Sequence, residues 1–156
     1  MTAQHVSIRT VHPSQPEVSA LLDLHLHAAR TGTKAGYSFA LDHSALAKPG
    51  ITLFGVYAGD ELVALGALSE LGNDELEVKS MRVAPGNVGK GYGRLILDHL
   101  IAEARKRGAV TMRLETGTTP DYVPANGLYS SAGFIPTGPF AQYAASDHNR
   151  FYALTL

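Results

Sequence analysis

Three glycines at alternate positions, Gly89, Gly91 and Gly93, mark the stretch of this chain with the clearest chemical potential. They lie in the run Val83-Ala-Pro-Gly-Asn-Val-Gly-Lys-Gly-Tyr-Gly-Arg94, between an apolar strand-like segment and an amphipathic helix-like one. Glycine lets the backbone turn so that successive N–H groups face one concavity, and the start of the following helix carries partial positive charge. The stretch therefore predicts an anion-binding site, with a tight turn that merely starts a helix as the simpler alternative.

The spacing of these glycines does not fit two common nucleotide-binding motifs. A dinucleotide fingerprint requires a third glycine after Gly91 and Gly93, but Leu95 and Ile96 follow instead. A Walker loop requires Ser or Thr after its Gly-Lys pair, but Lys90 is followed by Gly91. Both of these common nucleotide-binding interpretations therefore fail.

The stretch resembles motif A of the GNAT superfamily of N-acetyltransferases, in which an Arg or Gln precedes two spaced small residues. That pattern falls here on Val88-Gly89-Lys90-Gly91-Tyr92-Gly93, with Val88 in place of the Arg or Gln. Farther along, Leu128-Tyr-Ser-Ser-Ala-Gly-Phe134 is similar to the family's late L-Y-x-x-x-G-F segment. The resemblance implies that the anion is an acyl-CoA and that Val88 weakens its affinity without changing its identity.

The resemblance also implies which residues contact the acetyl-CoA co-substrate. They are Met81, Arg82, Val83, Val88, Gly89, Lys90, Gly91, Tyr92, Gly93 and Arg94. The loop amides are expected to bind the pyrophosphate, and the main chain of Met81 and Val83 is expected to bind the pantetheine arm.

Acyl transfer to an amine needs a base and an acid. Tyr129 occupies the position of the family's tyrosine, which donates a proton to the leaving thiolate, although a tyrosine that only packs its helix fits as well. Glu77 has the spacing from the loop at which several family members carry a carboxylate that acts through water. Glu75, Glu77 and Lys79 equally fit a solvated or salt-bridged row on one strand face, so the base is left open between Glu77, a histidine and water.

The chain contains no cysteine, which excludes disulfides and an acyl-cysteine intermediate and favours direct transfer to the acceptor. His25 and His27 are two positions apart on an expected helix and do not share a face. No metal site is expected from the sequence.

The elements that position these residues follow an α/β order that is not a continuous βαβ array. Strands are expected at His5–Val11, Ile51–Ala58, Glu61–Leu68, Glu75–Val83, Thr111–Glu115 and Phe151–Leu156. Helices are expected at Glu17–Ala29, from about Leu41 to before Pro49, and at Gly91–Arg107 and Pro124–Ala132. This order is similar to the GNAT fold, a mixed and mostly antiparallel sheet with helices on both faces. Its two central parallel strands, here Glu75–Val83 and Thr111–Glu115, splay apart.

Length and charge agree with one domain over residues 1–156. A chain of 156 residues with 45% hydrophobic composition can bury one substantial core. Its net charge of −1 gives no overall attraction to nucleic acid or to an anionic membrane. The first residues lack the basic and apolar pattern of a signal peptide, so a cytoplasmic location is expected.

The function expected from these features is acetyl-CoA-dependent N-acetylation of a small-molecule or amino-acid-like amine. By resemblance, two segments shape the acceptor pocket, and they supply His27, Arg30, Tyr37, Phe39, Phe140, Gln142, Tyr143 and Asp147. The aromatic residues among them fit equally well a small hydrophobic cluster that packs beneath the loops, separate from the main core. The alternative function is a non-catalytic acyl-CoA-binding module for sensing or interaction, and an O-acceptor or another acyl-CoA is a weaker option. A homodimer is left open.

Overall fold

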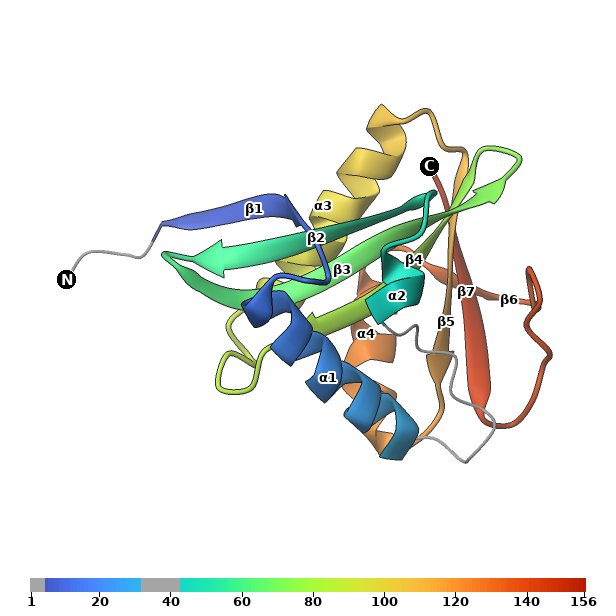
Figure 1. Cartoon of the computed structure of the whole chain (residues 1–156). Coiled ribbons are helices and arrows are strands. Elements are labelled where there is room, and N and C mark those ends of the chain that lie inside the picture. The colour runs from blue at the N-terminus through green and yellow to red at the C-terminus, as the bar shows by residue number, and fades with distance from the viewer. Residues whose placement is uncertain (1–4, 32–42) are drawn as a thin grey trace.

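The computed structural model describes residues 5–31 and 43–156, and these form one seven-stranded sheet flanked by helices (Figure 1). The strands are β1 (Val6–Val11), β2 (Ile51–Ala58), β3 (Glu61–Gly72), β4 (Glu75–Val83), β5 (Thr111–Gly117), β6 (Ile135–Thr137) and β7 (Asn149–Thr155). The helices are α1 (Pro16–Thr31), α2 (His43–Leu46), α3 (Tyr92–Lys106) and α4 (Val123–Ser131), with a single 3₁₀ turn η1 (Pro120–Tyr122) before α4. None of the described helices is both long and apolar enough to cross a membrane.

Helices cover both faces of the sheet, as expected. In Figure 1, α1 and α2 lie in front of the sheet and α3 and α4 lie behind it. The larger core packs the apolar stripe of α3 against the rear face; its α3 members are Ile96, Leu97, Leu100, Ile101 and Ala104. The smaller core packs Val18, Leu21 and Leu22 of α1 against the front face. The alternation along each strand thus sends side chains into two separate cores.

The strand order is β1-β2-β3-β4-β5-β7-β6, and β4 with β5 is the parallel pair within an otherwise antiparallel ladder. That pairing runs only from Glu75 opposite Thr111 to Glu77 opposite Arg113. Beyond these residues β4 continues to Val83 and β5 to Gly117 without a ladder between them. The predicted splay of the two central strands is therefore confirmed.

A bulge in β4 changes which side chains face α1. Lys79 pairs with Ala67 and Arg82 pairs with Leu65, and the register shifts between these pairs. Ser80 lies at this shift with a φ of 56°, a left-handed conformation that residues other than glycine adopt rarely. Because Ala67 and Leu65 both belong to the α1 core, Lys79 and Arg82 project from the same face of β4, where a regular strand would turn one of them away.

The predicted elements are present, and most of their ends differ from the prediction by one or more residues. The strand after the Gly59–Asp60 turn extends to Gly72, the strand from Thr111 extends to Gly117, and the short helix covers only His43–Leu46. Positions 41 and 42 of that predicted helix lie outside the described residues. The strand β6 was not predicted, because its three exposed residues include a proline and show no apolar alternation.

Candidate functional site

The opening between β4 and β5 is the central feature of the site. Where two strands diverge, the N–H and C=O groups on their facing edges have no ladder partner and can bind an extended ligand that carries amides. Met81 and Val83 lie on the diverging part of β4, while the β3 edge of the strand remains paired through Arg82 and Val83. Among the described residues, the opening is thus bordered by strand edges that have no ladder partner, within an intact sheet.

The glycine loop leads from the end of β4 to the start of α3, directly after the diverging segment. Gly86, Gly89 and Gly91 have φ values of 83°, 83° and 87°. A Cβ atom at Gly89 or Gly91 would meet no atom within 4 Å, so these two glycines serve the backbone turn and leave the loop surface open. Gly91 caps α3 without a side-chain hydrogen bond, which leaves the first amides of the helix directed outward.

Gly93 differs from the other two motif glycines, because it lies inside the first turn of α3 and has no positive φ. A Cβ atom there would come within 3.5 Å of Leu128 of α4 and 3.6 Å of Val83. Gly93 therefore brings the start of α3 close to α4 and to the end of β4. The expectation that all three glycines turn the loop is wrong for this residue.

The side chains of the loop have distinct environments. Asn87 is buried at the base and donates to Glu61 at 3.4 Å, while Lys90 lies 3.5 Å from Asn87 Oδ1. Arg94 makes an ion pair of 2.8 Å with Asp98 and donates to Ser131 Oγ, joining α3 to the end of α4. Val88 is 76% exposed, so the position where the family pattern has Arg or Gln points to solvent.

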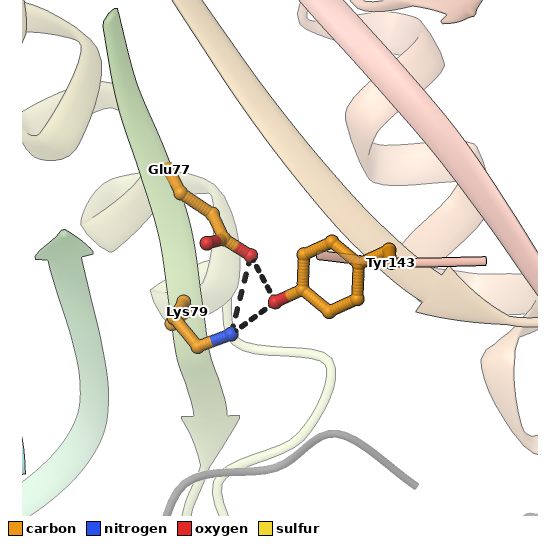
Figure 2. Close-up of polar contacts among 3 residues, drawn as sticks. All are labelled: Glu77, Lys79 and Tyr143. Atoms are coloured by element: carbon orange, nitrogen blue, oxygen red, sulfur yellow. Dashed lines mark hydrogen bonds and ion pairs between the residues drawn. The ribbon is translucent and has the colours of Figure 1, made fainter. Parts of the chain in front are cut away.

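A buried polar cluster lies on the α1 face of the sheet beside the opening (Figure 2). Its members are Glu77, Lys79 and Tyr143, and Glu77 is 5% exposed. The Tyr143 hydroxyl donates to Glu77 Oε2 at 2.5 Å, and Lys79 Nζ lies 3.2 Å from the same oxygen and also contacts the Tyr143 hydroxyl. Burial and the negative charge of Glu77 raise the pKa of Tyr143, which keeps its phenol protonated as a donor.

Glu77 is accordingly not a solvated strand residue. Its neighbour Glu75 forms a bidentate ion pair with Arg113 on this strand face. The Arg113 guanidinium donates to the two Glu75 carboxylate oxygens at 2.9 and 3.1 Å. Glu77 instead has its charge balanced by Lys79 in a protein-lined environment, where a single unpaired charge would be costly.

The segment between β6 and β7 brings Tyr143 to this cluster. Phe140, Tyr143 and Phe151 pack in edge-on and tilted contacts with centroid distances of 5.1 to 6.0 Å. Of the other residues expected to shape the acceptor pocket, His27, Gln142 and Asp147 are exposed. Tyr37, Phe39 and the Arg30 side chain lie outside the described residues.

A second carboxylate, Glu115, lies on β5 at the edge of the opening. It is two residues beyond Arg113, the last β5 residue paired with β4, and on the same face as Arg113 and Glu77. Burial raises the pKa of Glu115 to about 7; Lys79 opposes this rise and the charge of Glu77 adds to it. A carboxyl group with this pKa exchanges protons near neutral pH.

Tyr129 approaches the opening from the rear face. It is a buried residue of α4 that packs against Phe134 and Tyr152. Its hydroxyl makes no hydrogen bond to the described residues. Burial, followed by the charge of Glu115, raises the pKa of Tyr129 to about 12. Tyr129 is therefore a neutral phenol with an uncommitted proton, although it also fills part of the larger core.

Tyr122 and Asn126 hold the end of β5 in place. A Cβ atom at Gly117 would lie 2.3 Å from the Tyr122 ring, so only glycine permits this approach. Asn126 donates to the carbonyls of Gly117 and Tyr122 and accepts from the Tyr152 hydroxyl. Asn126 thus fixes the β5–α4 connection that presents Tyr129.

Sequence reasoning named Glu77 and Tyr129 for proton transfer and Arg82 as a contact of acetyl-CoA, and it did not name Glu115. The structure directs the Arg82 side chain to the α1 face, away from the glycine loop. A signal for Glu115 was present in Thr111-Met-Arg-Leu-Glu115, where charged residues alternate with the buried Met112 and Leu114. The orientation of Arg82 had no such signal, because it depends on a bulge at a serine.

Comparisons with known proteins agree with this geometry. The profile of the Acetyltransferase (GNAT) family matches residues 18–134. The uncharacterized N-acetyltransferase YedL of Escherichia coli is 36% identical over 96% of this chain and 94% of its own length. The uncharacterized N-acetyltransferase YsnE of Bacillus subtilis is 38% identical over 90% of this chain and 93% of its own length.

Solved structures share the fold over nearly the whole chain. A candidate acyl-CoA N-acyltransferase from Klebsiella pneumoniae has a TM-score of 0.78 at 26% identity and covers 97% of each chain. A Bacillus subtilis acetyltransferase in complex with CoA has a TM-score of 0.72 at 19% identity, over 97% of this chain and 99% of that one. From the family profile and the full-length relatives, the chain belongs to the GNAT family of acetyltransferases and is an N-acetyltransferase.

Proposed function

We propose that the chain uses acetyl-CoA to acetylate the amine of a small molecule, with an amino-acid-like compound as the acceptor. The observation that carries this proposal is the continuity of the free edge of β4 with the glycine loop and the start of α3. A ligand with an extended amide-bearing arm and a pyrophosphate has groups for both parts. Acetyl-CoA has this composition, and when bound it supplies an acetyl thioester that an amine can attack.

Each side of the cofactor site has a separate task in this proposal. The amides from Val88 to Arg94 hold the pyrophosphate at the positive end of α3. The main chain of Met81 and Val83 holds the pantetheine arm. The Arg94 side chain, already paired with Asp98, acts mainly by holding α3 and α4 together. Lys90 projects from an exposed loop position and adds positive charge beside the phosphates.

Proton transfer falls to the two carboxylates and to Tyr129. The acceptor amine must lose a proton, and Glu77 is the proposed base, acting through water, with Glu115 as the second carboxylate able to accept it. Glu77 already accepts from Tyr143 and Lys79, whereas the raised pKa of Glu115 suits transfer near neutral pH. Tyr129 supplies the proton that the leaving sulfur gains as the nitrogen–carbon bond forms and the carbon–sulfur bond breaks.

The acceptor side of the opening supports a small molecule. The aromatic contacts of Phe140 and Tyr143 hold the β6–β7 segment against β7 and the Glu77 cluster. Thr118 Oγ1 also donates to the Asp147 carbonyl at 2.8 Å, which fastens this segment to the chain after β5. A segment held at both ends narrows access to Glu77 and disfavours a bulky acceptor.

The test is release of CoA from acetyl-CoA in the presence of a panel of amines and amino acids, followed with a thiol-reactive dye. The chain has no cysteine, so the protein gives no background in this assay. We expect turnover with at least one amine and a matching mass increase of one acetyl group on that amine. CoA binding by calorimetry without turnover across the panel would favour the non-catalytic binding module instead, and absence of CoA binding would exclude both.

A further inference from the structure

Arg82 is a charged side chain without a charged partner on the acceptor face of the opening. It is half-buried, its Nε atom is enclosed without a hydrogen-bond partner, and it forms no ion pair with the described residues. An enclosed guanidinium nitrogen that has lost water and gained no acceptor costs free energy. By contrast, Lys79 and Arg113 each pair with a carboxylate.

The strand bulge is what places Arg82 on this face. The side chains of Met81 and Val83 point toward α3. Met81 lies beside Gly66, where Ile96 and Leu100 of α3 also pack, and Val83 lies beside Gly93. Arg82 therefore projects away from the α3 face, on which the glycine loop and the start of that helix lie. Ser80 adopts a costly left-handed backbone at the bulge, a kind of strain that persists where a side chain has to be re-aimed.

The described side chains of the helix opposite Arg82 supply no carboxylate that pairs with it. His25 of α1 faces Arg82, and burial together with the charge of Arg82 lowers the pKa of His25 to about 4. His25 is therefore neutral at physiological pH and cannot add to the positive charge or cancel it. Asp23 on the same helix is exposed and lies 3.3 Å from His43 Nε2. Among the described residues, Arg82 thus faces a neutral imidazole and has no ion-pair partner.

We infer that Arg82 binds a carboxylate of the acceptor, so that the substrate class is amino acids or other amines that carry a carboxylate. This inference rests on the proposed N-acetyltransferase function and assigns the acceptor-binding group of the same site. A carboxylate matches the planar fork of a guanidinium and satisfies its free donors, and the neutral imidazole of His25 can add one further hydrogen bond. Arg82 and Glu77 lie on one face of β4 with the bulge between them, so a carboxylate on Arg82 leaves the amine of a short acceptor near the opening.

The experiment compares L-amino acids with their own amides and with the corresponding decarboxylated amines, at fixed acetyl-CoA. For the wild type we expect kcat/KM at least about 10-fold higher for the acids than for the amides. Arg82→Gln should lower kcat/KM for the acids by about 30- to 100-fold and change the amides by less than about 3-fold, and Arg82→Lys should restore part of the loss. Arg105→Gln, an equal charge change on the exposed surface of α3, is the matched control and should leave both series unchanged.

Two further measurements separate a role of Arg82 in acceptor binding from a role in CoA binding. The Kd for CoA should be the same in wild type and Arg82→Gln, and the N-acetyl derivative of the best amino acid should raise the melting temperature of the CoA-bound wild type only. Equal rates for acids and amides in the wild type, or an Arg82→Gln variant that loses CoA affinity, would overturn the inference and leave the proposed function standing. Acetylation of neither series, with CoA still bound, would overturn the proposed function and the inference with it.

Discussion

Replacing Glu115 with glutamine is expected to make the protein more stable at alkaline pH and to leave it nearly unchanged in acid. The pKa of this carboxyl rises from 4.5 to about 7 in the folded protein, mainly through burial. The folded state therefore holds the proton more tightly than the unfolded chain. The contribution of Glu115 to stability is fully present below pH 4.5 and is lost as the pH rises toward 7.

The size of the effect follows from the shift. A rise of the pKa from 4.5 to about 7 corresponds to about 3 kcal/mol at full burial, and the partial exposure of Glu115 reduces this to about 1 to 2 kcal/mol. Glutamine keeps a similar shape and stays neutral at every pH. The difference in unfolding free energy between Glu115→Gln and wild type should therefore grow by about 1 kcal/mol from pH 5 to pH 8.5.

Urea unfolding followed by far-ultraviolet circular dichroism measures this difference, since the chain has no tryptophan. The exposed carboxylate variant Glu70→Gln is the control and should differ from wild type equally at both pH values. A difference for Glu115→Gln that is constant or shrinks with rising pH would refute the reasoning that burial holds this proton. In the acetylation assay, a base role for Glu115 predicts that kcat/KM falls below about pH 7 in wild type and that this fall is absent in the variant.

Three other substitutions test the remaining parts of the site. Tyr129→Phe should lower kcat by about 100-fold while the unfolding free energy changes by less than about 0.5 kcal/mol, because the lost hydroxyl has no hydrogen bond to the described residues; unchanged kcat would remove it as the acid. Val88→Arg should tighten CoA binding by about 3- to 10-fold in calorimetry, since this 76% exposed position has room for a guanidinium beside the phosphates; an equal Kd would show that the side chain is not used. Gly91→Ala should cost about 1 to 2 kcal/mol of stability and weaken CoA binding because the φ is 87°. Its control, Gly127→Ala in α4, has open space around it and should instead stabilise the protein by up to about 1 kcal/mol; equal effects at both glycines would contradict the argument from φ.

Local patterns in the sequence were enough to predict the glycine loop after β4 and the helix that follows it. The glycine spacing and the amphipathic segment that forms α3 are both encoded within a short stretch of chain. The order of strands and helices also followed from local periodicity and turn residues. These features depend on neighbours in sequence, so one sequence is sufficient to find them.

The acceptor side depends on contacts that local patterns do not encode. Tyr143 reaches Glu77 from 66 positions away, and no spacing rule connects a tyrosine in an irregular segment with a carboxylate on a strand. The length of the β4–β5 pairing and the bulge at Ser80 are properties of strand association, and serine carries no signal for a positive φ. The raised pKa of Glu115 and the enclosed Nε of Arg82 result from burial by other segments of the chain, which only the assembled fold reveals.

The most direct test of the account is the structure of the protein crystallised with acetyl-CoA. We expect the pyrophosphate on the amides of residues 88–94, the pantetheine arm hydrogen-bonded to the main chain of Met81 and Val83 within the β4–β5 opening, and the thioester sulfur within hydrogen-bond distance of the Tyr129 hydroxyl. A cofactor bound elsewhere, or β4 and β5 paired along their full length with the loop empty, would contradict it.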